Sequence, residues 1–186
     1  ARYEAIEVEP DDNAFRRRIN ELRAEGYVGV NVTIPHKERA LKYADDASEA
    51  ARNIGAANML TFSDRGVIAE NSDAMAVETI VRRLPASPRS ILLLGAGGAA
   101  RGVLFALKSA LAGAEIVLAN RTRARAEDIA GAAVVDWAAR NDALACADLV
   151  INATSLGMQG QPPLDLDHDR MKEGAAVFDI VYAPLE

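Results

Sequence analysis

The chain has 186 residues, half of them apolar and 5% aromatic, and its formal net charge at pH 7 is −6. This acidic balance argues against a nucleic-acid partner and against an anionic membrane surface, because both carry charge of the same sign. Cys146 is the only cysteine, which excludes an internal disulfide and is typical of a cytoplasmic enzyme. Its small apolar neighbours predict that it packs rather than acts as a nucleophile. We expect no signal peptide and no membrane-spanning segment.

The first half of the chain is predicted to be a small α/β domain. Periodicity and turn residues predict strands over 3–8, 27–33, 58–62 and 67–70, and helices over 13–25, 35–44, 45–55 and 74–84. Pro35 is expected to open its helix, and Asp45 or Asp46 to cap the next one, which stops at Gly55. The proline-rich segment 85–88 is expected to separate a domain of residues 1–86 from one of residues 87–186.

The second half is predicted to be a Rossmann-type, doubly wound parallel sheet. Strands over 90–94, 115–119, 134–135, 148–152 and 177–181 alternate with helices over 99–112 and 123–130. Residues 157–169 are expected to form a loop, in which His168 lies among three aspartates. A solvated acidic loop is favoured there over a metal site, so no metal is predicted.

A glycine-rich turn follows the first of these strands. Four aliphatic residues, 91–94, lead into Gly95-Ala96-Gly97-Gly98-Ala99-Ala100 and then into an Ala/Leu-rich helix. Gly95 would permit the tight turn, Gly97 the approach of a pyrophosphate, and Ala100 close packing of helix on strand. The helix N-terminus favours an anion, so the pattern predicts a dinucleotide site.

The end of the next strand indicates which dinucleotide binds. NAD enzymes carry an acidic residue there, whereas an arginine accommodates the 2′-phosphate of NADP. This strand ends in Asn120-Arg121-Thr122-Arg123-Ala124-Arg125, and no acid appears before Glu127. Guanidinium groups bind phosphate in a bidentate manner, so NADP is favoured over NAD. The alternative is a solvated basic helix start.

A second group of polar residues lies in the first half. Asn31 and Thr33 are two apart on a strand and face the same way, and Lys37 follows in the next helix. Either register of the 58–70 hairpin gathers Asn58, Asn71 and Asp73 at its open end, where Asp73 could reach Lys37. Such a Lys–Asp pair beside amides could bind a polyhydroxylated acid and move its proton. The alternative is a hairpin end held by local turns and a surface ion pair.

Taken together, these motifs resemble those of shikimate dehydrogenases over nearly the whole chain. The matching segments are 31–37 (NVTIPHK), 55–58 (GAAN), 71–73 (NSD), 95–99 (GAGGA), 120–122 (NRT), 152–158 (NATSLGM) and 179–182 (DIVY). The resemblance implies an NADP-dependent oxidoreductase that interconverts 3-dehydroshikimate and shikimate, in the chorismate route to aromatic amino acids. Residues 1–86 would then be the substrate-binding catalytic domain and 87–186 the NADP-binding domain.

The resemblance also implies roles for individual residues. Lys37 would be the catalytic acid/base and Asp73 its partner. Substrate would be held by Thr33, Asn58 and Asp73, with Lys37 and Asn31 nearby. The cofactor would be bound by Gly95, Ala96, Gly97, Gly98, Ala99, Asn120, Arg121, Thr122, Arg125, Thr154, Ile180 and Tyr182.

Three departures from the family pattern leave other functions open. The given sequence starts after the place of the Ser-x-Ser-Pro segment that is usual in the family, and it ends before the place of the usual glutamine helix. Ser72 and Met59 replace threonines that are usual in the family. The alternatives are a paralogue acting on quinate or an amino-hydroxy analogue, with NAD or NADP, and a non-catalytic NADP-binding module. The sequence leaves open whether the chain forms a homodimer.

Overall fold

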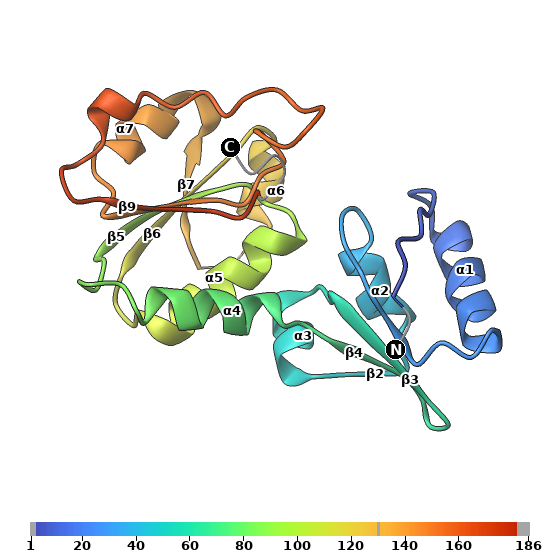
Figure 1. Ribbon diagram of the computed structural model, residues 1–186. Coiled ribbons are helices and arrows are strands. Elements are labelled where there is room, and N and C mark those ends of the chain that lie inside the picture. Colours follow the sequence, from blue (N-terminus) through green and yellow to red (C-terminus); the bar gives the residue numbers. More distant parts are fainter. Residues whose placement is uncertain (1–2, 130, 182–186) are drawn as a thin grey trace. The chain divides into compact units, whose positions relative to one another are not determined.

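The structure is a computed structural model that describes residues 3–129 and 131–181 (Figure 1). It divides into two compact units, Ala1–Ser72 and Asp73–Glu186. The sequence places the boundary later, at the prolines of 85–88. The boundary of the compact units lies earlier because helix α4 (Asp73–Val81) packs against α5 (Gly98–Ala110) and so belongs with the second unit.

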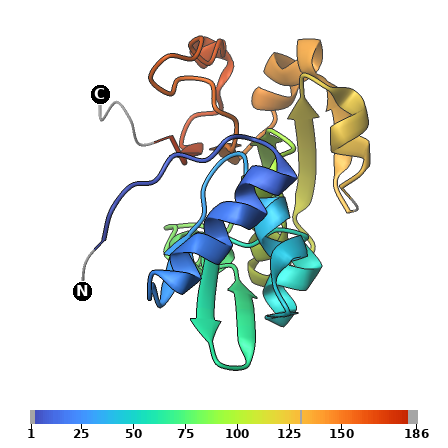
Figure 2. The same cartoon turned by 90° about the vertical axis from the view of Figure 1, so that its right-hand side faces the viewer.

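The described residues of unit 1 form a four-stranded mixed sheet and three helices. The order of its strands is β1-β3-β4-β2, and only β2 and β4 run parallel. Its elements are α1 (Asp12–Ala24), β1 (Gly29–Asn31), α2 (Lys37–Tyr43), β2 (Asp46–Ala47), α3 (Glu49–Ile54), β3 (Met59–Ser63) and β4 (Gly66–Glu70). The β3–β4 hairpin extends beyond the rest of this unit (Figure 2).

The unit 1 core joins one face of each helix to the hairpin. Phe15 and Ile19 of α1 and Ala40 of α2 are buried against Leu60 of β3 and Val67 of β4. The 3.6-residue spacing of apolar side chains in α1 therefore gives the predicted amphipathic helix. Asp11 caps it, since its carboxylate accepts the N–H groups of residues 13 and 14.

Three predictions for unit 1 are wrong, each for a local reason. Described residues 3–8 form no strand, because none of the described strands pairs with them. Helix α2 begins at Lys37 rather than at Pro35, because residues 33–36 form a turn. In this turn the His36 N–H donates to the Thr33 carbonyl at 2.9 Å. The Ile34–Pro35 peptide bond in the turn is cis. Ser48, not Asp45 or Asp46, caps α3, because residues 46–47 pair with β4.

Unit 2 contains the predicted five-stranded parallel sheet. Its order is β7-β6-β5-β8-β9 and all its pairs are parallel. Strands β6 and β7 are added on one side of β5, and β8 and β9 on the other, so the strand order reverses between β5 and β8. The strands are β5 (Ser90–Leu94), β6 (Glu115–Asn120), β7 (Ala133–Asp136), β8 (Leu149–Asn152) and β9 (Ala176–Asp179). The helices after α5 are α6 (Arg123–Glu127) and α7 (Arg140–Leu144), with short 3-10 turns at Trp137–Ala139 and His168–Arg170.

The aliphatic strand β5 is buried on both of its faces. Leu92 and Leu94 pack with Leu144 of α7, whereas Ile91 and Leu93 alternate to the opposite face, where α5 lies (Figure 1). This double burial is why β5 appears in the sequence as a continuous apolar run. Helix α7 has no counterpart in the sequence prediction, and α6 ends three residues early. Cys146 is exposed rather than packed.

Candidate functional site

The glycine turn lies at the point where the strand order of the unit 2 sheet reverses. Gly95 follows β5 with φ +107°, and a Cβ added to it would lie 2.7 Å from the Ala153 carbonyl oxygen. Only glycine therefore lets the turn after β5 approach the segment after β8. The two segments are joined by the Ala153 N–H, which donates to the Leu94 carbonyl at 2.8 Å. In open α/β sheets such reversal points bind ligands.

The turn leaves room for a ligand beside the N-terminus of α5. A Cβ added at Gly97 would have no atom within 4 Å, and Gly97 caps the 13-residue helix α5 without a side-chain hydrogen bond. Ala96 is buried and Gly98 and Ala99 are half-buried. The first-turn N–H groups and the open space at Gly97 fit the pyrophosphate of a dinucleotide, as the sequence predicts.

Asn152, at the end of β8, organises the other side of the reversal point. Its side chain is 2% exposed, and its Oδ1 accepts the Thr154 N–H at 3.0 Å and the Thr154 hydroxyl at 2.7 Å. Its Nδ2 donates to the Leu156 carbonyl at 3.2 Å and to the Asp179 carboxylate at 3.0 Å. Asn152 thus fixes Thr154, a predicted cofactor residue. Asn152 itself has no role predicted from the sequence, although a polar residue that ends a buried strand is a usable signal.

The last predicted cofactor residues lie after β9. The Ile180 N–H donates to the Asn152 carbonyl at 3.2 Å, which places Ile180 beside the same strand end. Tyr182 lies outside the described residues.

The basic segment after β6 contains arginines in two different states. Arg121 and Arg125 are exposed, and neither makes an ion pair within the described residues. Arg123, in contrast, lies 2.7 Å from a Glu127 oxygen and 2.9 Å from an Asp136 oxygen. Asn120 Nδ2 donates to the Thr122 carbonyl at 2.8 Å, which closes the bend between β6 and α6. Arg121 and Arg125 are therefore the guanidinium groups available to a phosphate.

Unit 1 gathers most of its predicted site residues at one end of its sheet. The Val32 N–H donates to the Asn58 carbonyl at 2.8 Å, and the Asn58 N–H donates to the Glu70 carbonyl at 3.0 Å. The ends of β1 and β4 therefore meet at Asn58. The Ala57 N–H donates to the Lys37 carbonyl at 2.9 Å, which brings the start of α2 to the same place.

The hairpin register settles which residue faces Asn58. Ser63 pairs with Gly66 and Met59 with Glu70, so the loop has two residues and Asn71 is next in register opposite Asn58. Asn58 also accepts the Ser72 N–H at 3.0 Å, and buried Asn71 donates to the Ala56 carbonyl at 2.9 Å.

The remaining predicted substrate residues are close to these along the chain. Thr33 is exposed, Lys37 is half-buried, and Asn31 donates to the Tyr3 hydroxyl at 3.1 Å. Asp73 follows Ser72 directly and is the first residue of α4.

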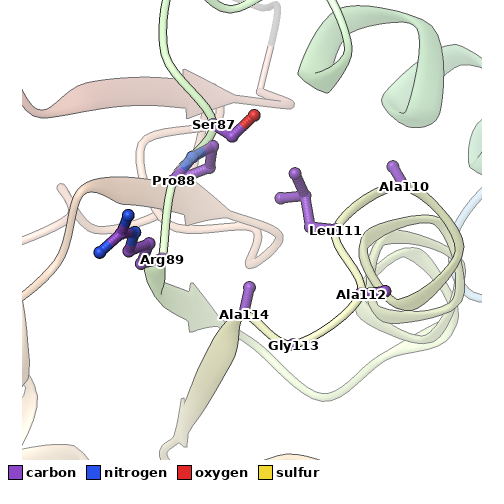
Figure 3. Close-up of a pocket in the computed structure, with 8 residues that line it drawn as sticks. All are labelled: Ser87, Pro88, Arg89, Ala110, Leu111, Ala112, Gly113 and Ala114. Carbon is purple, nitrogen blue, oxygen red and sulfur yellow. The ribbon is translucent and has the colours of Figure 1, made fainter.

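A cavity of about 610 Å³ lies at the opposite end of the unit 2 sheet. It is lined by Ser87, Pro88, Arg89, Ala110, Leu111, Ala112, Gly113 and Ala114 (Figure 3). Leu111 points into the space between the two segments, whereas the Arg89 guanidinium points away from it. Ser87 and Arg89 are its polar lining side chains, and with the guanidinium turned away no group of polar side chains converges there. The cavity also lies at the amino ends of the strands, where parallel sheets do not bind ligands.

Neither a metal site nor a membrane span is found in the described part of the chain. Within residues 3–129 and 131–181, no cluster of three or more His, Cys, Asp or Glu side chains could hold a metal ion. No described helix has the length and apolar character needed to cross a bilayer.

Two family models match the chain. Residues 1–60 match the shikimate dehydrogenase substrate binding domain, and residues 76–160 match the shikimate / quinate 5-dehydrogenase model. An NADP(+) shikimate dehydrogenase of Methylocella silvestris is 44% identical over 194 residues, covering 100% of this chain and 68% of the relative. One from Dinoroseobacter shibae is 49% identical, covering 86% and 61%. The chain spans about two thirds of the length of these relatives.

Solved structures show the same fold. The shikimate 5-dehydrogenase of Thermus thermophilus in complex with NADP(H) and shikimate has a TM-score of 0.77 at 33% identity, covering 92% of this chain and 65% of the other. The quinate dehydrogenase of Corynebacterium glutamicum in complex with NAD has a TM-score of 0.80 at 27% identity, with the same coverage. The glycine turn lies at the reversal point of a parallel sheet, and the sequence matches cover both halves of the chain. The chain therefore belongs to the shikimate dehydrogenase family.

Proposed function

We propose that this chain takes part in the NADPH-dependent reduction of 3-dehydroshikimate to shikimate, in the synthesis of aromatic amino acids. The observation that carries the proposal is an open glycine turn together with Arg121 and Arg125, which make no ion pair within the described residues, in a chain 44% identical to an NADP(+) shikimate dehydrogenase. The arginines favour the 2′-phosphate of NADP over the bare ribose of NAD.

The proposed chemistry divides between the cofactor and one lysine. NADPH, held by the glycine turn and by Arg121 and Arg125, would supply a hydride to the carbonyl carbon. Lys37 supplies the proton to the alkoxide oxygen that this forms, so that the carbonyl becomes a hydroxyl and the lysine ends as the neutral amine. We assign Asp73 as the partner that orients the Lys37 ammonium and binds a neighbouring substrate hydroxyl. Asn31, Thr33 and Asn58 would hold the remaining polar groups of the substrate.

The arrangement within unit 1 supports the assignment of Lys37. Its carbonyl accepts the Ala57 N–H, so the start of α2 is tied to the segment that carries Asn58. A lysine held beside amide and hydroxyl groups can both bind a polyhydroxylated acid and give up a proton. Arginine could not do the latter, because its guanidinium stays charged.

The proposal is tested by replacing Lys37 with alanine in the complete gene product. We expect kcat to fall by at least two orders of magnitude, the size of a general acid/base contribution, with a smaller change in KM. Lys42→Ala is the matched control, because Lys42 is exposed in the same helix. A Lys37→Ala enzyme whose kcat stays within about tenfold of the original would contradict the assigned role.

A second substrate is favoured by one comparison. The quinate dehydrogenase with bound NAD has a TM-score of 0.80 to this chain. Initial rates on shikimate and on quinate, each with NADP and with NAD, separate the two activities. We expect the highest kcat/KM for shikimate with NADP. A protein that binds NADP but oxidises neither acid would instead be a non-catalytic binding module.

We propose a cytoplasmic enzyme whose partner is its small-molecule substrate. Light scattering of the purified protein decides between a monomer and a homodimer.

A further inference from the structure

One arginine of the basic segment is already occupied by protein carboxylates. Arg123 Nε donates to Glu127 at 2.7 Å, and its Nη1 donates to Asp136 at 2.9 Å. These contacts, the Asp136 hydrogen bond most, raise the pKa of the Arg123 guanidinium. Arg123 is therefore committed to two acidic side chains, whereas Arg121 and Arg125 on either side of it make no ion pair among the described residues.

The position of Asp136 gives this ion pair a functional meaning. Asp136 ends β7 and pairs in register with Asn120, which ends β6. In a Rossmann fold the end of this second strand is where an NAD enzyme carries the acid that binds the ribose 2′-hydroxyl. Here that position is the uncharged Asn120, but an acidic residue, Asp136, stands opposite it on the adjacent strand, and neighbouring strands lie about 5 Å apart.

An uncompensated carboxylate at this place would oppose the proposed cofactor. It would repel a 2′-phosphate and could accept a hydrogen bond from a 2′-hydroxyl. Glu127 adds a second negative charge one helical turn beyond Arg123. Glu127 and Asp136 together carry two negative charges, and the guanidinium of Arg123 offsets one of them. The net negative charge near Arg121 and Arg125 is lower as a result.

We propose that Arg123 is a specificity-determining residue that acts through Asp136: by neutralising this carboxylate it maintains the preference for NADP over NAD. The inference rests on the proposed function, because it concerns the same cofactor. Arg123 itself need not touch the phosphate, which is left to Arg121 and Arg125.

The expected effect is moderate. The side chains of Arg123, Glu127 and Asp136 are 48%, 53% and 68% exposed, so water and salt screen their charges. A single exposed carboxylate should change the affinity for a phosphate a few ångströms away by about three- to tenfold. The change should shrink as the salt concentration rises.

The test measures the dissociation constants of NADP and NAD by calorimetry, without turnover. Arg123→Gln should weaken NADP binding about three- to tenfold and leave NAD binding unchanged or tighter. Adding Asp136→Asn to Arg123→Gln should restore most of the NADP affinity. Arg123→Lys, which keeps the positive charge, should bind NADP nearly as well as the original protein and guards against a variant that merely folds poorly.

Other outcomes overturn the inference in distinguishable ways. If the double variant stays as weak as Arg123→Gln, then Arg123 binds the phosphate directly or holds the local fold. If Arg123→Gln keeps the original NADP preference, then the ion pair has no role in specificity, while the proposed function stands. A protein that binds neither dinucleotide overturns the proposed function and this inference with it.

Discussion

The two ends of the parallel sheet in unit 2 use their polar groups in opposite ways. At the amino ends, the Asp148 carboxylate accepts the N–H groups of Arg89 and Ser90, at 2.9 and 3.0 Å, and the Lys172 ammonium at 2.8 Å. At the carboxyl ends, Gly97 faces open space and Arg121 makes no ion pair within the described residues.

This difference separates stability from binding. Donors and acceptors that satisfy one another hold strands together but have little left for a ligand. Polar groups without a partner in the protein lower its stability, and they are kept where a ligand supplies that partner. The cavity beside Leu111 lies at the amino ends and is not expected to bind a ligand, because no set of polar side chains converges in it. Substitutions at the two ends should therefore have different effects.

The largest effect is expected at Gly95. A Gly95→Ala side chain would meet the Ala153 carbonyl oxygen at 2.7 Å, in a backbone conformation with φ +107°. Strain and the clash together should lower the free energy of unfolding by about 2–4 kcal/mol and abolish measurable NADP binding. Denaturant unfolding and calorimetric titration measure the two effects.

The matched control lies at the other end of the sheet. Gly113 also has a positive φ, +88°, but a Cβ there would meet no atom within 4 Å. Gly113→Ala should cost only the backbone strain, about 1 kcal/mol, and leave cofactor binding intact. Equal losses at Gly95 and Gly113 would show that close approach to the segment after β8 is unimportant.

Asn152 is the next most sensitive position. Asn152→Leu would leave the Thr154 N–H and the Leu156 carbonyl without their side-chain partner in a buried setting. We expect a loss of about 2–3 kcal/mol in unfolding free energy and weaker NADP binding, since Thr154 loses its anchor. Asn141→Leu is the control, because the Asn141 side chain accepts the Asp167 N–H in an exposed setting. This substitution should cost under about 1 kcal/mol.

Arg121 should control cofactor choice rather than stability. Arg121→Asp removes the proposed charge-assisted contact to the 2′-phosphate and adds a carboxylate that suits the 2′-hydroxyl of NAD. NADP affinity should fall about ten- to a hundredfold, with NAD affinity unchanged or improved, as measured by titration with each dinucleotide. Arg83→Asp, a substitution of an exposed arginine beyond α4, should change neither affinity. An unaltered ratio in Arg121→Asp would exclude a phosphate contact.

Much of unit 2 could be predicted from the sequence because its signals are local. Four consecutive aliphatic residues followed by Gly95 and Gly97 specify a buried strand, a turn and a helix within one short segment. Helix α7 was not predicted because five residues carry too little periodicity to reveal a helix. The Arg123–Asp136 contact could not be predicted either, because it depends on the register between β6 and β7.

In unit 1 the sequence predicts the hairpin and the amphipathic helix α1, whereas the expected strand over 3–8 is wrong. Residues 63–66 carry a strong turn signal, which is local. Residues 3–8 have the alternation of a strand, yet a strand exists only when a partner accepts its hydrogen bonds, and periodicity does not show the partner. The carbonyl of Asn58 receives the Val32 N–H, so the site depends on contacts between residues far apart in the chain.

The smallest expected effect, and the one that depends on pH, is at Asp148. The Lys172 ammonium, with the N–H groups of Arg89 and Ser90, holds the pKa of the Asp148 carboxyl well below its usual range. A lowered pKa in the folded state means that the carboxylate stabilises the fold fully above its unfolded pKa of about 4. This contribution is lost as pH falls from there toward the folded pKa.

Asp148→Asn should therefore lower Tm by a few degrees at pH 7 and by the same amount at pH 5, and the difference from the original protein should shrink steadily below about pH 4. Calorimetric melting across this range measures the difference. Asp169→Asn, at an exposed carboxylate in the 3-10 turn His168–Arg170, serves as the control and should leave Tm unchanged. A gap in Tm that stays constant from pH 7 to pH 2 would mean that Asp148 acts through shape and not through charge. NADP affinity should not change in Asp148→Asn, because this carboxylate joins the amino ends of the strands, away from the edge where the dinucleotide is proposed to bind.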